Sequence, residues 1–363
     1  MPATGKYMKA LIAMSGGVDS SVAALLMKNE GYECTGCTMK LYENDTVCNY
    51  KKATCCSLKD VEDARNVAYR LSMPYYVFNF TGDFKEKIID KFIGCYEKGI
   101  TPNPCIDCNR YMKFEKLYER AVLMDCDVIV TGHYATVEEK DGEYFLKKSV
   151  DASKDQSYVL YSLTQEQLKH TRFPLGSLTK AEVRKIADEN GFINAAKPDS
   201  QDICFVPDGD YSASIEKLAG KKYPPGDFIL KDGTVIGKHK GIIHYTIGQR
   251  KGLGIAAEHP YYVVAIDAEN NTVTLGDNED LFTTTFYVKH LNWISGKAPE
   301  GEFRCNAKIR YRHAEKPASA FLIAEDTLKV VFDEPQRAVT PGQSAVLYDN
   351  DYVIGGGEIV SKP

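Results

Sequence analysis

Short apolar runs alternate with amphipathic segments through the first 208 residues, and this alternation limits the possible folds more than any other feature of the sequence. Residues 9–14, 32–39, 75–80 and 127–131 are predicted to be buried strands. The segments between them have the apolar spacing of helices. A strand–helix alternation is typical of a parallel sheet wrapped by helices, so the first half predicts an α/β domain.

Two predicted helices begin with a capping box, in which a hydroxyl residue is followed three positions later by an acidic one. Ser57 with Asp60 is the first, and Thr179 with Glu182 is the second. We expect the second helix to continue to about Asn190.

The character of the sequence changes after about residue 208, where turn-forming pairs separate short β-branched and aromatic runs. This half is predicted to be mostly β. We expect a parallel-sheet catalytic domain over residues 1–208, a small central domain over 209–285 and a C-terminal β-barrel over 286–363.

Residues 15–21 read Ser-Gly-Gly-Val-Asp-Ser-Ser and lie between the first strand and a helical run. The glycine pair allows a tight turn and close approach to phosphate, and the amides and dipole of the following helix favour an anion. The alternative is a simple turn with Ser20 as helix N-cap. Asp19 either helps to hold a metal ion or positions the loop. The full pattern resembles the SGGxDS loop of PP-loop ATP pyrophosphatases, which cleave ATP between the α and β phosphates.

The chain lacks the Gly-Lys-Ser/Thr ending of a Walker-type loop, whose lysine reaches the β and γ phosphates. The loop therefore predicts adenylation rather than phosphoryl transfer.

Three of the eleven cysteines lie in polar, motif-like surroundings. Cys105 and Cys108 form a Cys-x-x-Cys pair behind the stiff segment Thr-Pro-Asn-Pro, and Cys204 follows in a polar loop far downstream. In a chain that we expect to be cytoplasmic, such cysteines serve metal binding or chemistry more often than disulfides. A second trio, Cys48, Cys55 and Cys56, is interpreted as incidental thiols, with extra zinc ligation as the alternative.

Over nearly its whole length the chain resembles the bacterial tRNA-specific 2-thiouridylases, members of the PP-loop superfamily. The matching segments are SGGVDS, residues 101–104 with Cys108 and Asn109, residues 131–134, 154–158, 201–205 and 245–250, and Arg310 with Tyr311. The resemblance implies transfer of sulfur to the wobble uridine of tRNA, with release of AMP and pyrophosphate from an adenylated base. The alternative is a PP-loop amidotransferase or ligase that acts on a small metabolite.

The resemblance also implies roles for individual residues. ATP, with Mg²⁺, is expected at Ala13, Met14, Ser15, Gly16, Gly17, Val18, Asp19, Ser20, Met39 and Gly132. Contacts to tRNA are expected at Asn103, Pro104, His133, Lys154, Asp155, Gln156, Arg310, Tyr311 and Gln343. Cys108 and Cys204 are implied to be catalytic, one as nucleophile and the other as persulfide carrier.

Cys105 departs from the best-known version of the family, which has an aspartate at this position. Thiolates are the usual ligands of iron–sulfur clusters, so Cys105, Cys108 and Cys204 are predicted to hold a [4Fe-4S] cluster with one open iron. That iron would carry the incoming sulfide. A cluster-free persulfide route is the first alternative and structural zinc the second.

The net charge of −5 gives no global sign of nucleic-acid binding, so RNA contacts must come from local groups. The expected partners are tRNA with a wobble uridine and a sulfur donor, either sulfide or a persulfide-carrying protein. We expect no membrane segment and a monomer or weak dimer.

Overall fold

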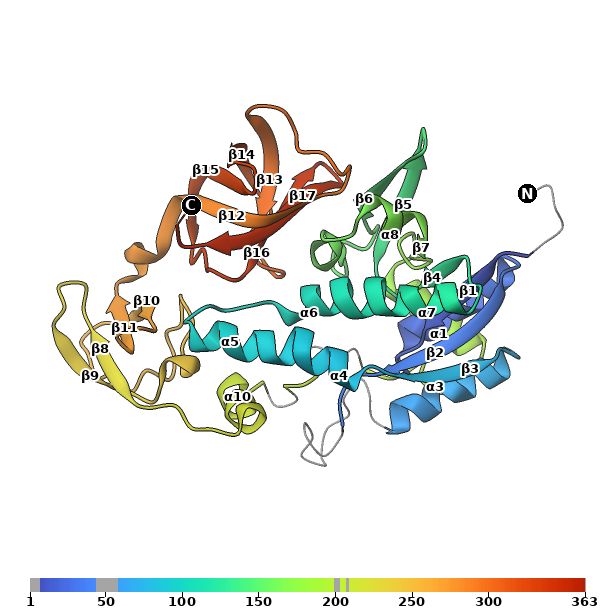
Figure 1. The fold of residues 1–363 in the computed structure, drawn as a ribbon, viewed down its shortest axis with the longest axis horizontal. Helices are drawn as coiled ribbons and strands as arrows, with labels where there is room; N and C mark the ends of the chain where they lie inside the picture. Colours follow the sequence, from blue (N-terminus) through green and yellow to red (C-terminus); the bar gives the residue numbers. More distant parts are fainter. Residues whose placement is uncertain (1–6, 44–57, 199–202, 207–208, 363) are drawn as a thin grey trace.

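The computed structural model describes residues 7–43, 58–198, 203–206 and 209–362. Figure 1 shows a parallel-sheet domain built from the N-terminal half, a small yellow and orange sheet at the far end of two long helices, and an orange and red barrel beside those helices. The predicted fold class, a parallel sheet followed by a small domain and a β-barrel, is confirmed.

The first sheet has five parallel strands in the order β3-β2-β1-β4-β7. Their bounds are Lys9–Ala13 (β1), Glu33–Lys40 (β2), Tyr75–Asn79 (β3), Val128–Val130 (β4) and Thr171–Arg172 (β7). The four predicted strands are confirmed, but the prediction that residues 75–80 are buried is wrong. β3 is the edge strand, where Tyr76 is 49% and Val77 is 43% exposed.

Helices cover both faces of this sheet. Alternate residues of β1 point to opposite faces and pack against these helices. Ala10 and Ile12 pack in one core with helices α1, α3 and α9, whose bounds are Val18–Asn29, Leu58–Arg70 and Lys180–Glu189. Leu11 packs in a second core with η2 and α7, which span Cys108–Lys116 and Leu117–Leu123.

The predicted helix starts have different outcomes. The Thr179–Glu182 capping box is confirmed, and α9 ends at Glu189 with Asn190 as its C-cap. Ser57 lies outside the described residues.

Two long helical rods lie side by side (Figure 1). One consists of α4 (Thr81–Phe84), η1 (Lys85–Asp90) and α5 (Lys91–Glu97), and the other of α6 (Pro104–Asp107), η2 and α7. η1 and η2 are π-helical. Ion pairs join the rods, with 2.8 Å between Lys91 Nζ and Asp107 Oδ1 and 2.9 Å between Lys87 Nζ and Glu115 Oε1.

The central domain is a small sheet preceded by helix α10 (Tyr211–Ala219). Its strands are β8 (Gly226–Ile229), β9 (Val235–His239), β10 (Tyr262–Asp267) and β11 (Thr272–Gly276), in the order β10-β11-β8-β9. The short helix η4 (Ile242–His244) follows β9. The apolar side chains of this sheet share one core with Phe92 and Tyr96 of α5, so the end of the first rod carries the central domain.

The C-terminal domain is an antiparallel barrel closed by pairing of its first and last strands. Its strands are β12 (Phe282–Trp293), β13 (Phe303–Lys308), β14 (Lys316–Ala324), β15 (Thr327–Arg337), β16 (Ser344–Asp349) and β17 (Tyr352–Val360), and η5 (Asn278–Leu281) precedes them. β12 begins four residues before the predicted domain boundary at 286.

A hairpin of the first domain extends the barrel sheet. β5 (Ala135–Lys140) and β6 (Glu143–Lys148) reach β17 through the pair Tyr352 and Lys147. The helices η3 (Ser157–Leu160) and α8 (Gln165–Lys169) complete this region. Within the described residues, no helix is both long and apolar enough to span a membrane.

Candidate functional site

The strand order of the parallel sheet reverses beside β1, because the chain runs outward through β2 and β3 and then returns to β4 on the other side. Ligands of open α/β sheets bind at such switch points, outside the carboxyl ends of the strands. The Ser15–Ser21 loop follows β1, and Thr131-Gly132-His133 follows β4. A Cβ atom on Gly132 would lie 2.8 Å from Asp19 C and Ser20 N, so the two segments are in direct contact.

The nucleotide loop is held in shape by its own hydroxyl groups. Ser15 N donates to Ser20 Oγ over 3.2 Å, and Ser20 Oγ donates to Gly17 O over 3.0 Å. The N-cap of α1 is Gly17, so the alternative interpretation of Ser20 as N-cap is wrong. Because Gly17 has no side chain, the first amides of α1 depend on another group, and an anion is suited to them.

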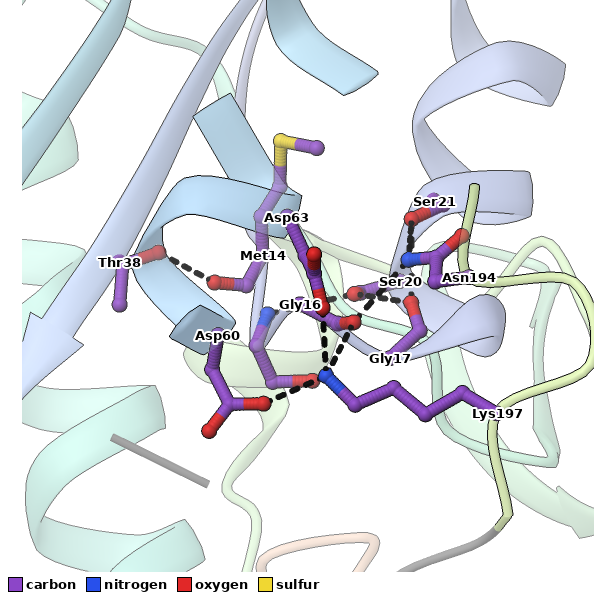
Figure 2. A network of polar contacts seen from close by, with 11 residues as sticks. Met14, Gly16, Gly17, Ser20, Ser21, Thr38, Asp60, Asp63, Asn194 and Lys197 are labelled. Atoms are coloured by element: carbon purple, nitrogen blue, oxygen red, sulfur yellow. Dashed lines mark hydrogen bonds and ion pairs between the residues drawn. The ribbon is translucent and has the colours of Figure 1, made fainter. Parts of the chain in front are cut away.

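A buried ionic network fixes the other side of the loop (Figure 2). Lys197 Nζ donates to Gly16 O over 3.1 Å and contacts Asp60 Oδ1 at 2.5 Å and Asp63 Oδ2 at 2.9 Å. Asn194 Nδ2 donates to the same carbonyl over 3.0 Å. The side chains of Asp60 and Asp63 are only 5% and 12% exposed, so Lys197 compensates charges that would be costly to bury alone.

Gly16 has no room for a side chain. Its φ is +75°, and a Cβ atom would lie 2.3 Å from the carbonyl oxygen of Asp60. The N-terminal turn of α3 therefore lies directly against the loop, and glycine is required both by conformation and by space.

The carboxylate of Asp19 is held by two other side chains of the protein. Lys180 Nζ lies 2.7 Å from Asp19 Oδ1, and the hydroxyl of Tyr134 donates to the same oxygen over 2.8 Å. Of the two roles left open by the sequence, these contacts favour positioning of the loop.

His133, predicted to contact RNA, is only 6% exposed. Its Nδ1 lies 2.6 Å from Thr131 Oγ1 and its Nε2 lies 3.2 Å from Lys113 Nζ. Burial, followed by the charge of Lys113, lowers the pKa of His133 well below its ordinary value, so the ring is neutral. A lysine ammonium has only hydrogens to donate, so Nε2 is the acceptor and Nδ1 carries the proton.

Both predicted catalytic thiols border one apolar core. Cys108 begins η2, and Cys204 packs on the same core, where the hydroxyl of Tyr42 donates to its carbonyl oxygen over 3.2 Å. Cys105 is exposed, and its backbone amide donates to Asn103 Oδ1 over 3.2 Å. Met39, predicted to contact ATP, packs between this core and the one under η2.

The three thiols are not assembled into a metal centre. Among the described residues, no group of three or more His, Cys, Asp or Glu side chains has an arrangement that could hold a metal ion. Residues 199–202, next to Cys204, are outside the description, as are Cys48, Cys55 and Cys56.

The segment before Asn103 and Pro104 is held by the barrel. Thr101 N donates to Pro341 O over 3.1 Å, and Gln343 Nε2 donates to Thr101 O over 2.8 Å. The hydroxyls of Thr101 and Thr246 in the central domain lie 3.4 Å apart. All three domains therefore meet at Thr101, two residues before the predicted target-base contact.

Residues 154–156 are held by contacts with neighbouring segments of the first domain. Gln156 Oε1 accepts from Tyr134 N over 3.0 Å, and Asp155 Oδ2 accepts from Ser157 Oγ over 2.7 Å. Lys154 N donates to Asp151 O over 3.0 Å.

Tyr311 is 38% exposed and lies near both Asp155 and Cys105. Burial raises its pKa, the charge of Asp155 raises it further, and the charge of Arg312 opposes the shift. This tyrosine thus connects the predicted RNA contacts of the barrel with those near the thiols.

The side chain of Arg310 makes hydrogen bonds inside the protein. Its guanidinium donates to Ile247 O over 3.3 Å, to Ala338 O over 3.1 Å and to the hydroxyl of Thr340, which joins the central domain to the barrel. Burial lowers its pKa.

Sequence reasoning missed the groups that hold the loop and the histidine: Asp60, Asp63, Lys113, Lys180, Asn194 and Lys197. Asp60 is part of a predicted capping box and Lys180 follows the N-cap of another, but none of these residues has a local signal for its role, because their partners come from distant segments.

Three family models match the chain in order. They are described as tRNA methyl transferase HUP domain over residues 8–208, tRNA methyl transferase PRC-barrel domain over 213–277 and Aminomethyltransferase beta-barrel domain over 283–359. The tRNA-specific 2-thiouridylase MnmA of Clostridioides difficile is 53% identical, with 97% of this chain and 98% of that protein covered. The protein of the same name from Acetivibrio thermocellus is 51% identical, with 97% and 99% covered.

Proposed function

Because this chain belongs to the tRNA-specific 2-thiouridylase family, we propose that it replaces the 2-oxygen of the wobble uridine of tRNA with sulfur at the expense of ATP. The observation that carries this proposal is the Gly16-Gly17 turn at the sheet switch point, which leads into the N-terminus of α1 without a side-chain cap. Cys108, at the start of η2, provides the thiol. The loop supports adenylation, and the thiol supports sulfur transfer.

In the first step the uracil 2-oxygen attacks the α-phosphorus of ATP. The bond from this phosphorus to the bridging oxygen breaks, pyrophosphate leaves and the base loses its N3 proton. The free amides at the start of α1, together with Mg²⁺, would stabilise the charge that develops on the phosphates. Because Gly16 and Gly17 are already held in position, the loop needs little rearrangement.

In the second step sulfur attacks C2 of the adenylated base, and AMP leaves with the former 2-oxygen. In the persulfide route, Cys108 or Cys204 carries the outer sulfur to C2. The other thiolate then attacks the inner sulfur, which releases the thiocarbonyl and leaves a disulfide for an external thiol to reduce. The shared apolar core brings both segments into one region.

A [4Fe-4S] cluster on Cys105, Cys108 and Cys204 is the alternative carrier. The donor type suits iron–sulfur chemistry, but the described arrangement does not bring the three thiols together. Anaerobic reconstitution tests this carrier directly, because wild-type protein should gain about four irons and four sulfides with visible absorbance if it is correct, and Cys105→Ala should not.

The tRNA would lie where the three domains meet, at Asn103, Pro104, Tyr311 and residues 154–156. Bases of single-stranded loops are accessible to such sites, and tyrosine offers a face for stacking. His133 and Arg310 would act from inside the protein, since both are occupied by internal contacts.

The test is release of pyrophosphate and formation of 2-thiouridine with unmodified tRNA, ATP, Mg²⁺ and a sulfur donor. Wild-type protein should perform both reactions. Cys108→Ser and Cys204→Ser should retain tRNA-dependent pyrophosphate release and lose thiolation, whereas Cys126→Ser should retain both. Pyrophosphate release that needs a small metabolite and no tRNA would instead identify an amidotransferase or ligase.

A further inference from the structure

Among the residues that the structure describes, Lys113 differs from the other lysines around the nucleotide loop in having no carboxylate partner. Lys180 is paired with Asp19, and Lys197 is paired with two aspartates. Within the described part of the chain, the polar partner of Lys113 Nζ is His133 Nε2 at 3.2 Å, and no Asp or Glu lies within 4.0 Å. No carboxylate of the described residues therefore pairs with this ammonium.

The partner of Lys113 is built to stay neutral. The ring of His133 packs against Phe114 and Phe173, with ring centroids 6.1 Å and 5.8 Å away, and its Nδ1 is engaged by Thr131. A neutral imidazole accepts a hydrogen bond and fixes the ammonium in place, but it adds no negative charge. A half-buried cation held in this way is suited to a ligand that brings the charge.

The position of Lys113 points to the nucleotide. His133 follows Gly132, which is in direct contact with Asp19 and Ser20 of the nucleotide loop. Lys113 lies on η2, the helix that begins with Cys108. This helix packs on the sheet face opposite to α1, so the ammonium approaches the switch point from that face.

We propose that Lys113 is a further catalytic residue, whose ammonium contacts the α-phosphate as the uridine adenylate forms and again as AMP leaves, with His133 as the residue that positions it. This inference rests on the proposed function. In both steps negative charge builds on the oxygens of the same phosphate. Lys113 neutralises that charge and neither gains nor loses a proton.

The test is tRNA-dependent release of pyrophosphate in a single turnover without sulfur donor, which isolates adenylation. Lys113→Met is compared with Lys113→Arg, which keeps the charge, and with Lys116→Met on the same helix. Lys116 is paired with Glu119 at 3.0 Å and serves as the matched control. Thermal unfolding and tRNA binding of each variant are measured in parallel.

Lys113→Met should slow pyrophosphate release about 100-fold, as loss of one preorganised electrostatic group does in other enzymes. The rate of pyrophosphate release by Lys113→Arg should lie within about tenfold of the wild-type rate, and the rate of Lys116→Met should equal it. A Lys113→Met rate within about threefold of wild type, or equal losses in the Met and Arg variants, would overturn the proposal. Absence of pyrophosphate release in wild type would contradict the proposed function itself.

His133 provides a second, independent test. His133→Leu should slow pyrophosphate release, and adding Lys113→Met to it should slow the reaction no further, because both changes remove the same group. If the two losses multiply in the double variant, His133 does not act through Lys113.

Discussion

Gln343 Nε2 donates a hydrogen bond over 2.8 Å to the carbonyl oxygen of Thr101, and this contact connects the C-terminal barrel to the segment that carries Asn103 and Cys105. The adjacent Gly342 has φ +87°, and a Cβ atom there would lie 2.3 Å from Ile100 Cγ2. The barrel thus packs against residues 100 and 101, which lead to the predicted target-base contacts. We propose that the barrel positions this segment for the reaction.

Gln343→Ala should therefore lower the kcat of thiolation strongly and the free energy of unfolding only slightly. Loss of one hydrogen bond should lower the free energy of unfolding by about 1 kcal/mol. A displaced 101–105 segment should lower kcat by about tenfold or more. Gln336→Ala is the matched control, because Gln336 Nε2 bonds locally to Glu334 O on the same barrel. Equal kcat values for both variants would contradict a positioning role.

Gly132→Ala should weaken ATP binding. The new Cβ would meet backbone atoms of Asp19 and Ser20 at 2.8 Å, so the nucleotide loop must shift. We expect the KM for ATP to rise about tenfold or more.

Gly94→Ala is the control for this change. Gly94 lies in α5, and a Cβ there has open space within 4 Å. This variant should bind ATP normally and be about 0.5–1 kcal/mol more stable, because alanine is the better helix former. Normal ATP binding by Gly132→Ala would show that the loop tolerates displacement.

The Asp19–Lys180 pair should couple loop position to helix α9. Asp19→Asn removes the charge of Asp19 from its contact with Lys180, whose side chain is 11% exposed. Since Asp19 is 31% exposed, the full penalty of a buried pair does not apply, and a loss of about 2 kcal/mol is expected. A double-mutant cycle with Lys180→Met in denaturant unfolding measures the coupling.

The exposed pair Lys185–Glu189, also on α9 and 3.8 Å apart, is the reference for this cycle. Its coupling should be near zero. Similar coupling in both pairs would mean that Asp19 is only a surface ion pair.

His133 should make the protein less stable in acid. Burial lowers its folded-state pKa, so below about pH 6.5 the unfolded chain binds a proton that the folded protein does not. Its contribution is fully present above that pH and is lost as the pH falls from 6.5 toward the folded-state pKa, by up to about 1.4 kcal/mol per pH unit.

The measurement is urea unfolding of wild type and His133→Gln between pH 7.5 and 5. Below pH 6.5 the free energy of unfolding of the variant should depend less steeply on pH than that of wild type. The difference in slope should correspond to about one bound proton. Three other histidines with lowered pKa values, His239, His244 and His313, remain in both proteins and cancel in the comparison. Parallel slopes would show that His133 is protonated in the folded state.

The sequence predicted much of the framework because its signals are local. Periodicity gave the four strands, and the Thr179–Glu182 capping box gave the start of α9. The apolar run at 75–80 was misread as buried because an edge strand and a central strand of a parallel sheet can have similar composition.

The site was less predictable because its contacts join distant segments. The loop at residues 15–21 was evident from its glycines, but its support by Lys197 spans 181 residues. Lys113 resembles any lysine on an amphipathic helix until His133 is seen beside it. Likewise, the inward direction of Arg310 depends on carbonyls of two other segments.

The most direct test of the central claim follows the oxygen that leaves the base. Unmodified tRNA that carries ¹⁸O at the 2-position of its wobble uridine is incubated with the protein, ATP, Mg²⁺ and sulfur donor, and the AMP is analysed by mass spectrometry. Adenylation of the base predicts one ¹⁸O in the phosphate of each AMP formed together with each 2-thiouridine. AMP without the label, alongside thiolated tRNA, would contradict the account.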